Sequence, residues 1–146
     1  MSEIEASVAK VIEGYRSAVA GRDVTAFMRL YDPAVRVFDA WGTWSYEGAA
    51  AWQVAIEGWF ASHPGDRLHA TFDDVRAVAT PAFAHASAIV TYAVVSAKGE
   101  RLNAIQNRLS WVLRTSGHVL RIVHEHTSAP VGFEDGKAIL QRPAKH

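Results

Sequence analysis

The stretch IVHEHTSAP, residues 122–130, contains the residue types of this chain best suited to chemistry. Side chains two residues apart in a strand point to the same face, so His124 and His126 share one face and Glu125 and Thr127 share the other. Two imidazoles at that spacing can supply two metal ligands. A third ligand would have to come from another part of the chain, and nothing in the sequence points to one. We therefore expect structural histidines and no bound metal.

Glu125 has two interpretations. If it faces an apolar cavity, burial raises its pKa and lets the carboxyl act as a general acid or base. If it lies beside Arg108 of the preceding apolar run, the two side chains form an ion pair. The sequence leaves both interpretations open.

Tryptophans gather around one loop and the helix predicted after it: Trp41, Trp44, Trp52 and Trp59. All of them can belong to an ordinary hydrophobic core. An aromatic wall of this size also suits a flat ligand, because large rings give a pocket apolar area and a defined shape. We expect the pocket to bind a small, largely apolar molecule and to use no cofactor.

Composition excludes several functional classes. Fifteen basic and fifteen acidic side chains cancel and are scattered, so we expect no binding to nucleic acid and none to a charged membrane. No apolar stretch is long enough to span a bilayer. The chain has no cysteine, which excludes disulfides and thiol chemistry and fits a cytoplasmic protein. Phosphate-binding loops, nucleophile elbows and HExxH motifs do not occur.

The elements that must position these residues fall into two blocks. Apolar residues at helical spacing predict helices over residues 2–20, 23–31 and 49–62. A Ser2–Glu5 capping box begins the first helix and Asp23 caps the second. Strand-like runs follow a short strand over residues 35–38, namely 67–80, 83–97, 101–114 and 118–129.

Helices followed by a meander of strands predict an α+β domain over residues 1–131, with three N-terminal helices packed on a strongly bent, mostly antiparallel sheet. Residues 132–146 form a C-terminal tail. Both faces of the run 83–97 are apolar, and one layer of helices covers only one of them. We therefore expect a homodimer that buries the other face.

This order of elements, together with IVHEHTSAP, resembles the cone-shaped family of nuclear transport factor 2. That family includes ketosteroid isomerases, SnoaL-like polyketide cyclases and the association domain of calcium/calmodulin-dependent protein kinase II. The resemblance covers the chain from the first helix to about Val131. It implies the same cone-shaped fold, with the pocket between the helices and the sheet.

The resemblance to ketosteroid isomerase assigns two catalytic positions. YRSAVAGRD and VRVFDAWG place Tyr15 where the isomerase has an oxyanion donor and Asp39 where it has its proton-shuttling base. The isomerase also has a neutral carboxylic acid on a later strand. The corresponding stretch here, RLNAIQNRLSW, contains no carboxylate, and an amide such as that of Asn107 can take over the hydrogen bond.

The resemblance to the kinase association domain assigns the rest of the pocket. Arg108 matches an arginine that faces the central pocket of that domain, and Thr127 stands where a second pocket arginine would be. This register implies that Glu125 and Thr127 point inward. The resemblance thus implies a cofactor-independent isomerase or cyclase that moves a proton next to a carbonyl. The alternative is a non-catalytic association, scaffold or ligand-binding domain.

Overall fold

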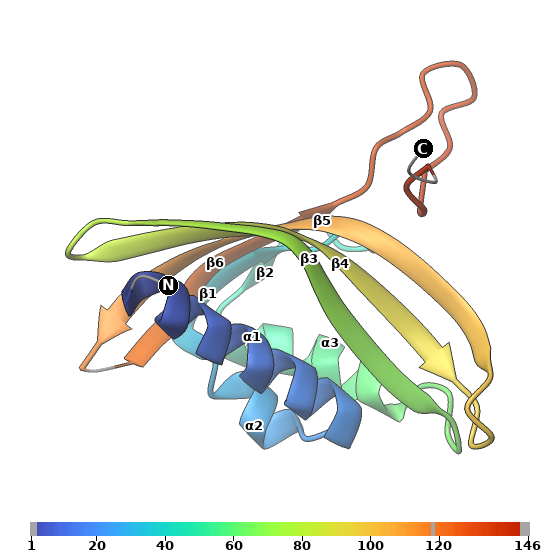
Figure 1. The fold of residues 1–146 in the computed structure, drawn as a ribbon, viewed down its shortest axis with the longest axis horizontal. Coiled ribbons are helices and arrows are strands. Elements are labelled where there is room, and N and C mark those ends of the chain that lie inside the picture. Colours follow the sequence, from blue (N-terminus) through green and yellow to red (C-terminus); the bar gives the residue numbers. More distant parts are fainter. Residues whose placement is uncertain (1–2, 118, 144–146) are drawn as a thin grey trace.

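The computed structural model describes residues 3–117 and 119–143. Its elements are α1 (Glu3–Gly21), α2 (Val24–Met28), β1 (Tyr31–Phe38), β2 (Tyr46–Glu47), α3 (Ala49–Ala61), β3 (Arg67–Ala79), β4 (Phe83–Val95), β5 (Arg101–Ser116) and β6 (Val119–Ser128). The predicted α+β class is confirmed, since the three helices pack against the concave face of one arched sheet (Figure 1). Among the described residues, no helix is long and apolar enough to cross a membrane.

The six strands form one sheet in the order β2-β1-β6-β5-β4-β3. Every neighbouring pair is antiparallel except β1 and β6, which run parallel. The first strand begins at Tyr31, earlier than the predicted residues 35–38. Proline has no backbone N–H to donate to a neighbouring strand. Pro33 is accommodated because the pairing of β1 with β6 is irregular between Tyr31 and Arg36, so no regular hydrogen-bond ladder is interrupted there. The short strand β2 was not predicted.

The bend of the sheet has a local cause. The pairing of β3 with β4 shifts register between Asp73 and Arg76, and Asp74 in that interval has φ of 51°. A second shift interrupts the pairing of β5 with β6 between Val112 and Leu113. Such bulges bend the bulged strand and increase its twist, so the long strands curve around the helices instead of lying flat.

The helices pack as their apolar spacing predicts. Val8, Val11, Tyr15 and Val19 lie on the buried face of α1, which packs against β3. The predicted cap at Ser2 lies outside the described residues. Asp23 does cap α2, because its side chain accepts a hydrogen bond from the backbone N–H of Ala26 (3.0 Å).

Arg22 joins the helices to one another. Its guanidinium donates to the carbonyl oxygens of Phe60, Ser62 (2.7 Å), His63 (2.9 Å) and Asp66 (2.7 Å), at the end of α3 and in the turn that follows. The last carbonyls of a helix have no partner within the helix. One side chain therefore satisfies the end of α3 and holds it against the junction of α1 and α2.

We predict that Arg22→Leu lowers the free energy of unfolding by about 2–3 kcal/mol, because charge-assisted hydrogen bonds are lost and partly buried carbonyls lose their partner. Urea denaturation measures the change. The matched control is Arg29→Leu at the exposed end of α2, which should change stability by less than about 0.5 kcal/mol. Equal effects of the two substitutions would contradict the role assigned to Arg22.

Candidate functional site

A cavity of about 410 Å³ lies between α3 and the concave face of the sheet. This volume falls within the range of small-molecule pockets. Of the residues that the sequence predicts for the site, it is lined by Tyr15, Asp39, Trp41, Trp52, Trp59, Asn107, Glu125 and Thr127. The remaining lining residues were not predicted: Tyr46, Ala55, Ile56, Tyr92 and Ile105.

Regular secondary structure positions most of this lining. Trp52, Ile56 and Trp59 follow helical spacing on the face of α3 that is turned toward the sheet. On β6, Glu125 and Thr127 follow the alternation of a strand, which turns both side chains inward. The helix supplies the apolar wall and the strand supplies the polar groups opposite it.

Asp39 follows β1 directly and is held at the cavity by β6. The hydroxyl of Thr127 donates to Asp39 Oδ1 (3.1 Å) and itself accepts from the backbone N–H of Ala40 (2.9 Å). Burial raises the pKa of Asp39 above its ordinary value, and hydrogen bonds from Thr127, Ala40 and Trp41 offset part of that rise. The carboxyl group is therefore oriented, half-buried and more basic than an exposed aspartate.

Glu125 is the most deeply buried charged side chain of the cavity, with a relative exposure of 1%. Its Oε1 accepts from the Tyr31 hydroxyl (2.6 Å) and from Trp111 Nε1 (2.9 Å). Burial raises the pKa of Glu125 to about 7, with a further contribution from the nearby charge of Asp39, and the two hydrogen bonds limit the rise. Near neutral pH the group is present in both its acid and its carboxylate form.

Two tyrosines provide neutral hydroxyl groups. The Tyr15 and Tyr92 hydroxyls lie 3.0 Å apart, and either can be the donor. Burial raises the pKa of both groups, so neither ionises near neutral pH. Tyr92 comes from β4 and was missed, although the alternation of that strand places it in phase with the buried Val90.

Asn107 contributes an unsatisfied acceptor. Its side chain lies in the wall on β5, and its Oδ1 is buried without a hydrogen-bond partner among the residues that the structure describes. A buried polar atom without a partner is unfavourable in a folded protein. A ligand that brings a hydroxyl or N–H group into the cavity would satisfy it.

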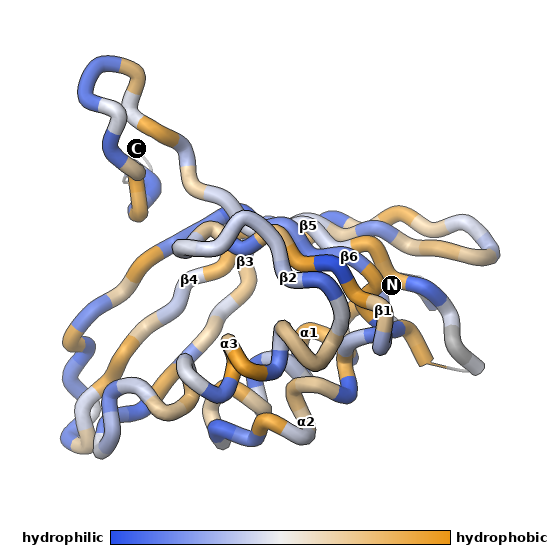
Figure 2. The backbone as a smooth tube through the Cα atoms, turned by 180° about the vertical axis from the view of Figure 1, so that it is seen from behind, coloured by the Kyte–Doolittle hydropathy of each residue, from blue (hydrophilic) through white to orange (hydrophobic). Residues whose placement is uncertain are grey.

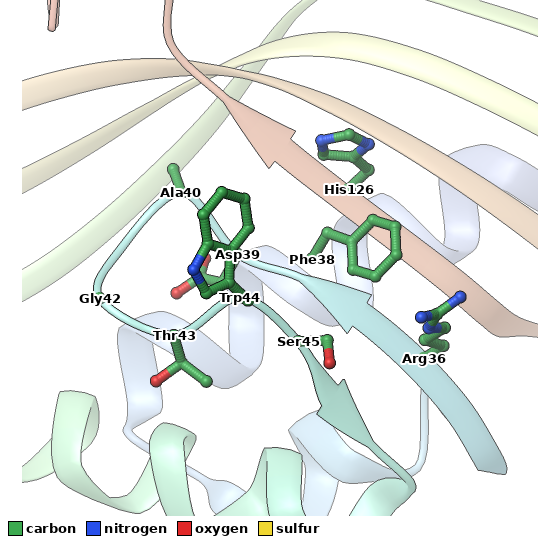
Figure 3. Close-up of a pocket in the computed structure, with 9 residues that line it drawn as sticks. All are labelled: Arg36, Phe38, Asp39, Ala40, Gly42, Thr43, Trp44, Ser45 and His126. Carbon is green, nitrogen blue, oxygen red and sulfur yellow. The ribbon is translucent and has the colours of Figure 1, made fainter.

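The prediction that Arg108 and Trp44 line this pocket is wrong. Asn107 faces the cavity, so the next residue of the strand, Arg108, faces the other side of the sheet, where its Nε donates to the hydroxyl of Ser128 (3.1 Å). The ion pair of Arg108 with Glu125 is excluded for the same reason. Trp44 is 96% exposed and lies at a separate hollow on the outer side (Figure 3).

The two histidines lie on the outer face of β6. Their rings pack edge-on against Phe38, with centroids at 5.1 Å for His124 and 5.4 Å for His126. His124 Nδ1 lies 2.9 Å from the carbonyl oxygen of Arg36. Within residues 3–117 and 119–143, no three potential metal-ligating side chains come together.

Comparison with known proteins gives a family match and several similar folds. A model of the SnoaL-like domain family matches residues 8–132. No curated protein matches the chain. An NTF2-like protein of unknown function from Pseudomonas putida KT2440 superimposes with a TM-score of 0.84 at 22% identity, covering 97% of this chain and 96% of that one.

Two more structures have the same fold. Aln2 from a Streptomyces species gives a TM-score of 0.78 at 16% identity, over 88% of this chain and 91% of that one. An uncharacterized protein with a cystatin-like fold from Caulobacter vibrioides gives 0.68 at 17% identity, over 87% and 89%. At these identities the similarity establishes the fold and leaves the reaction to be argued from the cavity.

We predict a pH-dependent stability that depends on Glu125. The pKa of Glu125 is about 7 in the folded chain against an ordinary 4.5, so between these pH values the folded chain holds a proton that the unfolded chain has released. The free energy of unfolding should therefore fall as pH rises through this window, by a total on the order of 3 kcal/mol.

Denaturant titrations from pH 4 to pH 8 measure this fall. Glu125→Gln should lose most of it, because the amide oxygen keeps an acceptor for Tyr31 and Trp111 but does not titrate. Glu57→Gln on the exposed side of α3 is the control and should follow the parent protein. An identical pH profile for Glu125→Gln and the parent would contradict a raised pKa.

Proposed function

The chain belongs to the SnoaL-like domain family of NTF2-like proteins, and we propose that it binds a small, flat carbonyl compound under α3 and moves a proton next to that carbonyl without a cofactor. The observation that carries the proposal is a pair of carboxyl groups in one aromatic cavity. Asp39 is half-buried and hydrogen-bonded, whereas Glu125 is fully buried. Different environments of this kind separate the pKa values of two acids and give them different roles.

Asp39 is the base of the proposed reaction. Its carboxylate takes a proton from the carbon beside the carbonyl, so a C–H bond breaks, an O–H bond forms on Asp39, and the electron pair moves onto the carbonyl oxygen. Asp39 then returns the proton to another carbon. Alternatively, the enolate carbon attacks a second carbonyl of the ligand, so that a C–C bond forms, the C=O π bond breaks, and Asp39 gives its proton to the resulting alkoxide oxygen. The hydrogen bond from Thr127 orients the carboxylate while leaving it basic.

Glu125 in its neutral form stabilises the negative charge that develops on the carbonyl oxygen in the proposed reaction. A carboxylic acid kept neutral in an apolar site can donate a hydrogen bond to the oxyanion of the intermediate. Glu125 lines the cavity and has a pKa of about 7, which keeps a large share of it protonated near neutral pH. The hydroxyls of Tyr15 and Tyr92 add neutral donors on the side of α1 and β4.

The lining also restricts the ligand. Trp41, Trp52 and Trp59 offer broad apolar surfaces, which favour a fused-ring or similarly flat molecule. The unpartnered Oδ1 of Asn107 favours a ligand that carries a hydroxyl group besides its carbonyl. Together these features favour a hydroxylated aromatic or polycyclic ketone.

The alternative is a ligand-binding or association domain without chemistry. It is favoured by the fact that Glu125 already has two internal donors, Tyr31 and Trp111, as a purely structural carboxyl would. In that case the cavity would still take the same ligands, but no proton would be exchanged.

We predict that the protein catalyses hydrogen–deuterium exchange at the carbon beside the carbonyl of 2-tetralone, a flat bicyclic ketone. Proton NMR in D₂O follows the exchange. Asp39→Asn should slow it by about 10²–10⁴-fold, because a positioned base is lost while the side chain keeps its shape. Glu57→Gln, on the outer side of the same helix that walls the cavity, should leave the rate unchanged.

No exchange by the parent protein, together with binding of the ketone, would support the alternative of a binding domain. Unchanged exchange in Asp39→Asn would remove Asp39 from the mechanism.

We further predict that 2-naphthol binds about tenfold more tightly than 2-methoxynaphthalene, which lacks the hydroxyl proton. Quenching of tryptophan fluorescence measures both affinities. Asn107→Leu should abolish the preference because it removes the acceptor, whereas Asn103→Leu on the exposed end of β5 should retain it. A preference that survives Asn107→Leu would show that another group binds the hydroxyl.

A further inference from the structure

The chain beyond β6 forms a hairpin, residues 130–141, which we call the C-terminal arm. It leaves the convex side of the sheet and projects away from the helices in both views (Figures 1 and 2). Gly132 N donates to Lys137 O (2.7 Å) and Ile139 N donates to Pro130 O (2.7 Å), which closes the hairpin. The arm therefore has an ordered shape of its own.

The base of the arm is fixed to the sheet. The regular pairing of β5 with β6 begins at Arg108, so the preceding part of β5 extends beyond the end of β6. The arm completes this free edge, since Gln106 N donates to Leu140 O (2.7 Å) and Gln141 Nε2 donates to Ala104 O (3.2 Å). The direction in which the arm projects is set by these bonds to β5.

The tip of the arm presents an aromatic ring followed by two acidic residues. Phe133 has a relative exposure of 104%, so none of the described residues buries its side chain. Glu134 and Asp135 come next and are exposed. Single exposed apolar residues are common, but this one is held away from the body of the protein on a braced hairpin. Burying the ring would be favourable, because apolar surface would leave water.

The outer side of the sheet carries a hollow whose lining includes aromatic side chains, the basic Arg36 and the acidic Asp39. It has a volume of about 600 Å³ and lies between the end of β1, the loop after it and β6 (Figure 3). Phe38 and Trp44 give it aromatic surfaces, and Arg36 and His126 lie beside them. The Arg36 guanidinium stands 4.6 Å from the centre of the Phe38 ring. Its Nε donates to the exposed Glu47 (2.8 Å). The guanidinium has other N–H groups, which can donate to a carboxylate of a partner.

We propose that the C-terminal arm of one chain docks into the outer hollow of a second copy of the same chain. Phe133 would lie against Phe38 and Trp44, and the acidic tip would face Arg36 and His126. Both contacts would form at once in a two-fold pair, because each chain offers one arm and one hollow. The arm thus contributes a residue to a site that is incomplete in one chain alone.

Several observations favour a second copy over another partner. Both halves of the contact carry aromatic side chains, Arg36 of the hollow is opposite in charge to the acidic tip, and one chain carries both halves. The arm of the same chain does not fill its own hollow, since the Phe133 ring is fully exposed. The formal net charge of zero adds no repulsion between copies. Ile89, Pro130 and Ile139 line a smaller hollow at the base of the arm, which adds apolar surface there.

This contact would reach the back of the ligand cavity. Asp39 lines both the outer hollow and the cavity under α3, and Trp41 belongs to the same loop. A partner's arm seated in the hollow would hold this loop from outside. Docking itself does not depend on the proposed reaction, and the experiments below measure assembly alone.

Sedimentation equilibrium at micromolar concentration tests the contact. The parent protein should show twice the chain mass of 16.0 kDa. Phe133→Ala should raise the dissociation constant of the dimer by about 30-fold or more, as expected for loss of a central aromatic anchor. Because the ring is fully exposed, this substitution should leave the fold of the monomer intact. Val54→Ala, which truncates another exposed apolar side chain, is the control and should leave the constant unchanged.

Disulfide trapping tests the geometry of the contact. The chain has no natural cysteine, so only the introduced cysteines can form disulfides. A Phe133→Cys chain is mixed with a Ser45→Cys chain of different mass, and the mixture is oxidised. We expect a mixed disulfide dimer on a non-reducing gel, because Ser45 lines the hollow. Phe133→Cys mixed with Val54→Cys should not form one. A monomeric parent protein, or a dimer without the 133–45 link, would overturn the proposal.

Discussion

The buried carboxyl of Glu125 connects three strands of the sheet, and much of the remaining structure depends on how it is accommodated. It lies on β6, directly across from Trp111 of β5, whose indole N–H binds it, while the Tyr31 hydroxyl reaches it from the start of β1. A carboxyl group buried this deeply is tolerated only with hydrogen-bond partners or a raised pKa, and Glu125 has both. The two donors require one register between β5 and β6. A slip of one residue would turn the Glu125 side chain to the opposite face of the sheet, away from Tyr31 and Trp111.

The same register separates two sets of chemistry on the two faces of β6. Glu125 and Thr127 face the helices, where Thr127 orients Asp39 opposite the aromatic wall of α3. His124 and His126 face outward around Phe38. The inner face therefore combines aromatic surface with oriented acids, as the proposed proton transfer requires. The outer face is open and aromatic, the conditions for contact with another protein surface.

Much of the fold followed from local pattern. The helical spacing of α1 and α3 and the alternation in the long strands gave the element types and most boundaries, because these periodicities report directly which side chains are buried together. The predicted strand over residues 35–38 was too short, because β1 also includes Pro33, and the irregular pairing with β6 tolerates a proline there. A bent sheet was expected, but the positions that bend it were not. They are bulges, such as that at Asp74, which depend on pairing between strands and leave no signal in the spacing of one strand.

For the site, the sequence alone determined which side chains share a face: Glu125 with Thr127, and His124 with His126. A strand's period of two fixes that grouping but does not say which face is inside. Tertiary structure decided that Arg108 lies outside, because the arched sheet turns its neighbour inward instead. It also separated Trp41 from Trp44 and brought Tyr92 to Tyr15. Loops have no periodicity, and contacts between distant strands depend on register and curvature, so neither could be derived from spacing along the chain.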